Sequence, residues 1–405
     1  MFERAHWIPA CAGTSGWGWI CLLTAMASRS KPMDRSDARW MEHALRLGRR
    51  NLGATGANPA VGCVIVADGP FGGRLVGAGW TGLGGRPHAE TGALAMAGDA
   101  ARGATAYVTL EPCSHHGRTA PCAKALIAAG VARVVTALED PDPRVAGRGH
   151  AALQAAGITA ETGLLAGEAR SDLAGYLSRI VRKRPHVVLK LAVSADGKIA
   201  ETAGAPTAIT GEAARNWVHA VRAEADAVLV GVSTVMADDP LLTCRLPGLE
   251  DRSPVRVISD SRASLAPDSR LARTAGTVPV WLLTLAGEDE PRARALAERG
   301  IVLIACAATA DSKVDLTDAL RRLAERGINR VLAEGGARMA RALVEADLVD
   351  EVYLLGASKA LGAGGLDALA GLPLSAITDS ERFRAAGKEW LGEDLLSVYE
   401  RVGVE

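Results

Sequence analysis

The sequence predicts two consecutive α/β domains. At 405 residues the chain is too long for one ordinary hydrophobic core. Apolar, β-branched runs alternate with segments of helical periodicity, a pattern that is typical of sheets covered by helices. The alternation is interrupted by a basic, proline-terminated segment, Arg179–Pro185, and restarts after it. We therefore expect a first domain over residues 33–180, a linker, and a second domain over residues 186–405.

The first domain is expected to open with a helix that begins at Asp34 or Ser36, since either residue is a suitable N-cap. Strands are predicted at 61–66, 74–79, 106–110 and 133–137, and helices at 88–97, 122–129 and 149–156. Residues 1–32 show neither the helical nor the strand period. We interpret them as a disordered extension, or as sequence upstream of a true start near Met33.

The second domain shows the same alternation after the linker. Strands are predicted at 186–193, 227–230, 255–258, 278–283, 301–305, 329–332 and 351–355. Helices are predicted near 211–223, 315–326 and 336–345. Each half therefore has the elements of a domain of its own.

Charge and composition exclude several classes of protein. Forty-six basic residues balance forty-six acidic ones without a basic stripe, which argues against a nucleic-acid partner. The seven cysteines lack a disulfide-like spacing and indicate a reducing compartment, so we expect a cytoplasmic protein. The longest apolar stretch near the N-terminus, Trp17–Ala27, is too short to span a membrane. A homo-oligomer is compatible with the sequence.

Three short motifs in the first domain predict a catalytic zinc site. They are His88-Ala89-Glu90, Glu111-Pro112-Cys113 and Pro121-Cys122. A catalytic Zn²⁺ keeps three protein ligands and one open position, and His88, Cys113 and Cys122 supply that number. The alternative, that these are ordinary buried residues, fits each one singly but not the combination. A purely structural zinc module would need a fourth ligand, and none is evident.

The chemistry of such a site is hydrolytic deamination. Zinc makes hydroxide available at neutral pH, and hydroxide adds to a ring carbon that bears an amine. Glu90 follows the histidine by two residues and is suited to move protons to the ring nitrogen and to the departing ammonia. Thr119 and Pro121 are expected to cap and open the next helix, which would place Cys122 near a helix N-terminus and favour its thiolate. The pattern H-x-E followed by P-C and C is the signature of zinc deaminases, although here eight residues separate the cysteines instead of two.

Residue motifs in the first domain closely resemble one family. The long loop between the cysteines, together with N-P-A-V-G at 58–62, T-L-E-P-C-S-H-H-G-R-T-A-P-C and D-P-D-P-R-V-A-G-R-G at 140–149, is similar to the bifunctional riboflavin-biosynthesis deaminase/reductase. The resemblance implies a cytidine-deaminase-like three-layer sandwich. It also implies a diaminopyrimidinone substrate that carries ribosylamine 5-phosphate. Asn58, His115 and the 140–149 loop would then lie near the ring or the ribose phosphate, although ordinary turn chemistry explains them as well.

The second domain carries weaker signals of its own. A glycine pair, Gly335-Gly336, opens a predicted helix, where backbone N–H groups can approach a phosphate, but a plain tight turn fits the same residues. Another match, G-x-G-x-x-G at 77–82, leads into a turn instead of a helix, and we interpret it as a loop.

The resemblance extends to the second domain, where it implies a reductase. The segments L-K-L-A-V-S-A-D-G-K-I-A at 189–200, S-T-V-M-A-D-D-P-L-L-T-C-R at 233–245 and A-E-G-G at 333–336 are similar to the family's NADPH-dependent reductase, which has a dihydrofolate-reductase-like fold. By position, the resemblance implies that the cofactor is held by Ala192, Thr234, Asp238, Gly336, Ala337 and Arg338. It implies that the substrate is held by Arg222, Leu242, Arg245 and Glu334.

This chain departs from the family where members read Ser-x-Trp-Ile-Thr. It has Pro206 and Ala208 in place of the serine and the tryptophan. A monofunctional deaminase with a degenerate, structural second domain is therefore an alternative. A nucleic-acid base editor is a further alternative, which the aromatic content of 4% and the zero net charge oppose.

Overall fold

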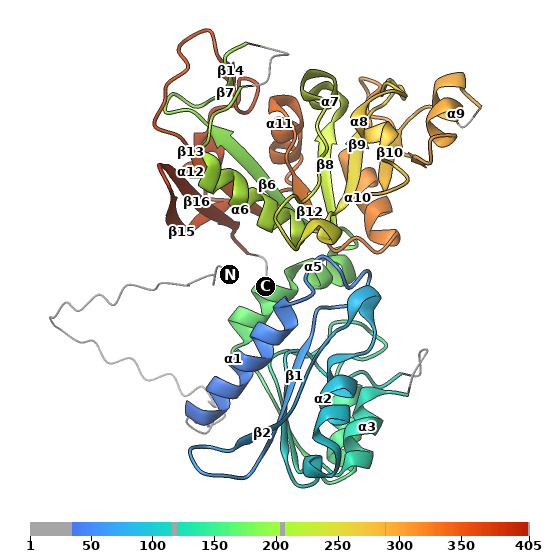
Figure 1. Cartoon of the computed structure of the whole chain (residues 1–405), viewed down its shortest axis with the longest axis vertical. Coiled ribbons are helices and arrows are strands. Elements are labelled where there is room, and N and C mark those ends of the chain that lie inside the picture. The colour runs from blue at the N-terminus through green and yellow to red at the C-terminus, as the bar shows by residue number, and fades with distance from the viewer. Residues whose placement is uncertain (1–34, 116–119, 203–206, 288, 404–405) are drawn as a thin grey trace, which may run out of the picture.

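Two large β-sheets, one in each half of the chain, organise the fold (Figure 1). The computed structural model describes residues 35–115, 120–202, 207–287 and 289–403. The interpretation of residues 1–32, and the predicted helix start at Asp34, lie outside the described residues. Within them, the first helix already includes Ser36.

The first sheet has five strands in the order β2-β1-β3-β4-β5. Its strands are β1 (Gly62–Ala67), β2 (Arg74–Trp80), β3 (Thr105–Val108), β4 (Arg133–Thr136) and β5 (Thr159–Thr162). β1 is antiparallel to both β2 and β3, whereas β3, β4 and β5 are parallel. The helices are α1 (Arg35–Arg49), α2 (Ala89–Ala97), α3 (Cys122–Ala129), α4 (Arg148–Ala155) and α5 (Ala166–Arg182).

Glycines show that helices cover both faces of this sheet. A Cβ on Gly62 would lie 1.8 Å from the Ala44 carbonyl oxygen in α1. A Cβ on Gly79, which pairs with the next residue of β1, would lie 2.1 Å from the Ala89 carbonyl oxygen in α2. Because successive residues of a strand face opposite sides, α1 and α2 lie on opposite faces and form a three-layer sandwich. The 77–82 motif thus includes strand residues as well as a loop. Its strand glycines allow α2 to pack closely against the sheet.

The second sheet has nine strands in the order β11-β10-β9-β8-β12-β6-β13-β16-β15. These strands are β6 (His186–Val193), β8 (Ala227–Gly231), β9 (Val255–Ser259), β10 (Val280–Thr284), β11 (Val302–Ala305), β12 (Arg330–Ala333), β13 (Glu351–Gly356), β15 (Phe383–Leu391) and β16 (Asp394–Arg401). The strands from β11 to β13 are parallel, and β16 and β15 extend the sheet antiparallel. A separate two-stranded sheet pairs β7 (Lys198–Ala200) with β14 (Leu366–Asp367).

Helices cover the second sheet on both faces. They are α6 (Glu212–Ala223), α7 (Val232–Asp238), α8 (Arg270–Arg273), α9 (Pro291–Ala297), α10 (Leu316–Glu325), α11 (Ala337–Glu345) and α12 (Ser375–Thr378). On β12, Leu332 packs with Val218 and Val221 of α6 in one apolar cluster. Its neighbour Val331 packs with residues of α10 and α11 in another cluster. Successive side chains of β12 therefore point to opposite faces of the sheet, and each face is covered by its own layer of helices.

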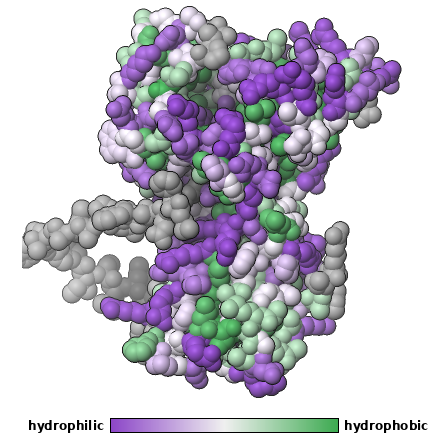
Figure 2. All heavy atoms as spheres, viewed as in Figure 1, coloured by the Kyte–Doolittle hydropathy of each residue, from purple (hydrophilic) through white to green (hydrophobic). Residues whose placement is uncertain are grey.

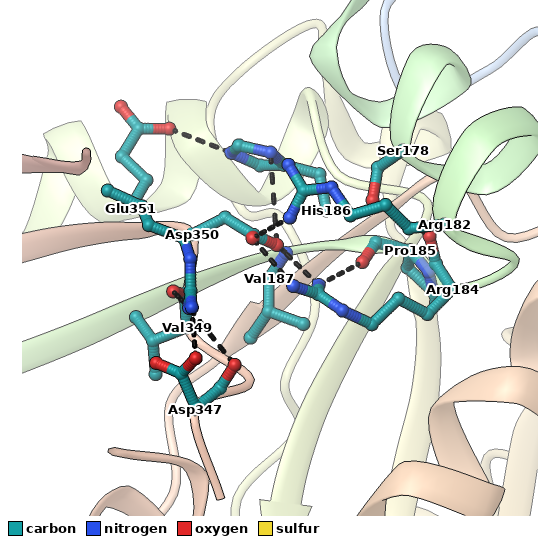
Figure 3. Close-up of polar contacts among 11 residues, drawn as sticks. Ser178, Arg182, Arg184, Pro185, His186, Val187, Asp347, Val349, Asp350 and Glu351 are labelled. Atoms are coloured by element: carbon teal, nitrogen blue, oxygen red, sulfur yellow. Dashed lines mark hydrogen bonds and ion pairs between the residues drawn. The ribbon is translucent and has the colours of Figure 1, made fainter. Parts of the chain in front are cut away.

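The linker prediction over Arg179–Pro185 is wrong at its start. Helix α5, which was not predicted, continues through Arg182, so only residues 183–185 connect it to β6. Asp350 fixes this connection, since it accepts hydrogen bonds from Arg182, Arg184 and the Val187 backbone N–H (Figure 3). The short connection and its buried carboxylate join the two domains without a flexible tether.

Among the described helices, none has the length and apolarity that a membrane crossing requires. In the view of Figure 2, hydrophilic side chains are frequent where the two domains meet. The polar contacts described below agree with a junction of this kind.

Candidate active sites

His88, Cys113 and Cys122 come together at one end of the first sheet. His88 is the N-cap residue of α2, Cys122 is the first residue of α3, and Cys113 follows β3. The His88 Nδ1 atom lies 3.3 Å from Cys122 Sγ and 3.6 Å from Cys113 Sγ. Within the described part of the chain, these three residues form the one group of side chains that could hold a metal, with ligand atoms within 4.8 Å of one another.

The donor set fits zinc. An imidazole and two sulfurs are ligands that Zn²⁺ prefers, and three ligands leave one position open. The Cys122 backbone N–H donates to Cys113 Sγ over 3.3 Å. Hydrogen bonds from the Cys122 thiol, His88 and this N–H lower the pKa of Cys113, which favours its thiolate form.

The expected position of Cys122 is confirmed, with Pro121 as the N-cap residue of α3. The expected thiolate on Cys122 stays a prediction. Its pKa is raised, because its thiol donates to the Cys113 thiolate and burial adds to the effect. Binding of zinc would require both cysteines as thiolates. Pro121 was predicted in the first turn and is instead the N-cap residue, whereas Thr119, the predicted cap, lies outside the described residues.

Glu90 lies in the first turn of α2 and is only 4% exposed. Burial raises its pKa to about 7, and the negative charge of Cys113 adds to the effect. The carboxyl group can therefore both hold and release a proton near neutral pH. This is the property that proton transfer beside a metal-bound reaction centre requires.

Glu111 is a residue whose part the sequence did not reveal. Its buried carboxylate accepts hydrogen bonds from four backbone N–H groups, those of Asp140, Gly147, Gly149 and His150, at 2.7–3.2 Å. It therefore fixes the 140–149 loop beside Cys113. Ser114 reaches the same loop, because its hydroxyl lies 3.4 Å from the Arg144 carbonyl oxygen.

The two other predicted residues of this domain are placed as follows. Asn58 is half-buried and packs so close to Gly85 that a Cβ there would lie 2.0 Å from its Nδ2. The Nδ1 atom of His115 is buried and has no hydrogen-bond partner among the described residues. A buried nitrogen of this kind is suited to a ligand contact.

A cavity of about 600 Å³ lies in the second domain. All six residues that were expected to hold the cofactor line it: Ala192, Thr234, Asp238, Gly336, Ala337 and Arg338. The Thr234 hydroxyl accepts a hydrogen bond from the Gly336 backbone N–H at 3.0 Å and so joins α7 to the start of α11. The glycine pair opens α11 toward the cavity, an arrangement that suits a phosphate group.

The predicted substrate residues of this domain are placed differently from one another. Arg222 and Glu334 form a bidentate ion pair at 2.6 and 2.8 Å, and Glu334 lines the cavity. Leu242 is 4% exposed and belongs to the apolar core. Arg245 is exposed, and neither it nor Leu242 lines the cavity. The structure thus brings one of the four to the cavity wall and a second behind it.

Lys190 is a cavity residue that lies in the 189–200 segment, although no role was predicted for it from the sequence. It lies on β6 and lines the cavity near Glu334, and burial lowers the pKa of its amine. A single lysine within the apolar run of β6 was the available signal. Ala208 also lines the cavity, whereas Pro206 lies outside the described residues.

Comparisons with known proteins agree with this division into two sites. The family model "Cytidine and deoxycytidylate deaminase zinc-binding region" matches residues 34–138, and "RibD C-terminal domain" matches residues 185–396. The chain is 40% identical over 372 residues to the riboflavin biosynthesis protein RibD of Escherichia coli, covering 89% of this chain and 98% of that protein. The chain belongs to the RibD family. It is also 39% identical over 381 residues to RibD of Haemophilus influenzae, covering 91% and 98%.

Solved RibD structures share the whole architecture. RibD of Acinetobacter baumannii (form 1) is 36% identical, with a TM-score of 0.80 and coverage of 91% of this chain and 99% of that one. A diaminohydroxyphosphoribosylaminopyrimidine deaminase/5-amino-6-(5-phosphoribosylamino)uracil reductase from Thermotoga maritima is 32% identical, with a TM-score of 0.77 and coverage of 90% and 99%.

Membership of the RibD family defines the general activity and both cofactors. The chain is a bifunctional riboflavin-biosynthesis enzyme, with a zinc-dependent, cytidine-deaminase-like domain and a dihydrofolate-reductase-like domain that uses NADPH. The alternative of a monofunctional deaminase is not favoured, because the RibD relatives match both halves.

Proposed function

We propose that the chain deaminates a diaminopyrimidinone that carries ribosylamine 5-phosphate, and then reduces the ribosyl group to ribityl with NADPH. The observation that carries the proposal is the cluster of His88, Cys113 and Cys122 with the buried carboxyl group of Glu90 beside it. The T. maritima relative, a diaminohydroxyphosphoribosylaminopyrimidine deaminase by name, supports the choice of substrate. Deamination is assigned to the domain that ends with α5, and reduction to the domain that begins at His186.

In the first domain, His88, Cys113 and Cys122 would hold the zinc ion. Zinc, when bound, lowers the pKa of a water molecule and makes it a nucleophile at neutral pH. The Glu90 carboxyl group transfers two protons in succession: one from the attacking water to the ring nitrogen, and one from the resulting hydroxyl group to the amino group, which then leaves as ammonia. Asn58, His115 and the 140–149 loop that Glu111 fixes bind and orient the ring and its ribose phosphate.

In the second domain, the backbone at Gly336, Ala337 and Arg338 binds a phosphate group of NADPH. NADPH supplies the hydride. Glu334, held in one orientation by Arg222, and the amine of Lys190 face the sugar and orient it by hydrogen bonds. Ala192, Thr234 and Asp238 form the remaining cofactor wall, and Arg245 and Leu242 belong to the adjacent turn.

In this proposal the enzyme binds a small phosphorylated pyrimidine, and neither a nucleic acid nor a membrane is a partner. We assign it to the cytoplasm, since free cysteines at a metal site favour a reducing compartment. A homo-oligomer is compatible with this proposal.

Mass spectrometry tests the two steps separately. The diaminopyrimidinone substrate is incubated with protein in the presence and absence of NADPH. We expect the deaminated ribosyl compound without NADPH and the ribityl compound with it. Unchanged substrate in both samples would contradict the proposal. Accumulation of the deaminated compound with saturating NADPH would contradict its second half.

A further inference from the structure

Residues 50–58, the first part of the connection between α1 and β1, are held by the second domain, and we name them the docked segment. Arg252, the last residue of a 3-10 helix at Glu250–Arg252, makes the first contact. Its guanidinium donates to the Asn51 side chain at 3.2 Å and to the backbone carbonyls of Arg50 and Leu52 at 3.2 and 2.9 Å. One cation thus fixes three consecutive residues of the other domain.

Asn329, just before β12, makes the second contact. Its Nδ2 donates to the Gly56 carbonyl at 2.7 Å, and its Oδ1 accepts from Arg179 Nε at 2.6 Å. Arg179 in turn donates to the carbonyl of Ala57. The C-terminal part of the docked segment is therefore held by a pair of side chains from α5 and the second domain.

Between these two contacts the backbones of the domains touch. Gly53 has a φ of +73°, and a Cβ there would lie 2.7 Å from the Glu224 carbonyl carbon and 2.9 Å from the Ala225 nitrogen. Only a residue without a side chain fits this approach. The docked segment is thus seated on the second domain along most of its length.

The docked segment also supports the deaminase site. Asn51 donates from its Nδ2 to the Thr81 carbonyl at 2.8 Å, and the Ala54 carbonyl accepts from the Gly84 N–H at 2.8 Å. The 81–87 stretch leads directly into His88. Asn58, which ends the docked segment, packs against Gly85 in the same stretch.

We propose that Arg252 and Asn329 are positioning residues for deamination, although both belong to the reductase domain. Through the docked segment they hold Asn58 and the 81–87 stretch in the geometry that binds the pyrimidine substrate. The inference rests on the proposed deaminase function. It means that the reductase domain completes the substrate site of the deaminase domain.

The test compares deamination kinetics of the full-length zinc enzyme with those of Arg252→Ala and Asn329→Ala. We expect the KM for deamination to rise about tenfold in each, as for the loss of a hydrogen-bonded charge or amide, while kcat changes less than about threefold. Arg252→Lys retains the positive charge but not the several N–H donors of the guanidinium, so its deamination KM should be intermediate. Hydrogen exchange should accelerate in residues 52–58 and remain unchanged in α2.

Controls separate positioning from stability. Zinc content and the kinetics of the reductase reaction should match those of the wild type. Arg299→Ala, at an exposed position of the second domain, should leave the deamination KM unchanged.

An unchanged KM in both Arg252→Ala and Asn329→Ala overturns the inference. A rise of the same size in Arg299→Ala, or a parallel loss of zinc and reductase activity, overturns it too, because these residues would then act through general stability. Absence of deamination in the wild type would instead reject the proposed function itself.

Discussion

The main chain of Cys122 supports the side chain of Cys113, since its N–H donates to Cys113 Sγ at 3.3 Å. Cys122→Ser keeps this N–H but replaces the second sulfur ligand. The purified wild type should carry about one zinc ion per chain, and the variant should lose most of it, because zinc binds thiolate far better than hydroxyl. Elemental analysis measures this. Cys306→Ser, a half-buried cysteine of the second domain, is the control and should retain zinc. Full zinc content in Cys122→Ser would refute the ligand assignment.

Glu90→Gln should separate proton transfer from metal binding. The amide has the size of the carboxyl group but cannot carry the proton. We expect zinc and substrate binding to persist while deamination falls by roughly a hundredfold or more. Single-turnover rates and zinc content give the comparison, with Glu42→Gln on the exposed side of α1 as the control. A loss of metal, or a rate near that of the wild type, would show that Glu90 has another role.

Asp350 makes the stability of the domain junction depend on pH. Burial alone would raise its pKa, but Arg184, His186 and Arg182 outweigh this and lower it from 3.8 to about 2. A lowered carboxyl pKa stabilises the folded state above the unfolded pKa, and the stabilisation is lost as pH falls from about 4 through 2. The contribution is on the order of 2 kcal/mol. Urea unfolding from pH 7 downward should show that Asp350→Asn is destabilised at neutral pH and that the difference from the wild type shrinks below pH 4. A difference that is constant with pH would contradict this.

Ala208→Trp tests whether the NADPH cavity is intact but lacks an aromatic wall. Ala208 lines the cavity, and the resemblance of the 206–210 segment to the family implies a tryptophan at this position. Burial of the indole against the cofactor should tighten NADPH binding by about 1–3 kcal/mol, unless neighbouring side chains already fill that space. Fluorescence titration with NADPH measures the affinity. Ala297→Trp on the exposed side of α9 is the control and should have no effect. Weaker binding in Ala208→Trp would mean that this space is already occupied.

A fragment that ends at Arg184 tests the independence of the deaminase domain. It retains the five-stranded sheet and its apolar cluster, so it should fold and bind zinc. Its deamination KM should exceed that of the full-length chain, because residues 50–58 lose Arg252 and Asn329. Circular dichroism, zinc analysis and deamination kinetics test the three points. An insoluble fragment would show that the two domains share their stability.

Local chemistry made the candidate zinc-binding cluster predictable from the sequence. His88, Cys113 and Cys122 carry their function in their own side chains and lie at strand–helix junctions that the hydrophobic pattern reveals. Helix α5 was missed because its end is basic and its middle contains Gly175. A Cβ at Gly175 would lie 3.1 Å from the Asn329 backbone, so tertiary contact explains a glycine that local propensity disfavours.

Long-range contacts explain the other differences between the predictions from the sequence and the structure. β15 is exposed along most of its length and is defined by its pairing with β16, so no apolar period marks it. Glu111 acts on N–H groups that lie 29 to 39 residues further along the chain. Leu242 adopts a positive φ of 55° and belongs to the apolar core. Its position in the 233–245 motif does not reveal this burial.

The close approach at Gly53 limits how this enzyme can be recombined with its relatives. In a deaminase that stands alone, the turn at this position could accept asparagine, which tolerates a positive φ. Here any side chain would meet the Glu224–Ala225 backbone of the neighbouring domain. A chimaera that joins this deaminase domain to another reductase should therefore exchange residues 50–58 and 224–252 as one block. Hybrids that split the block should assemble poorly even when each half is folded.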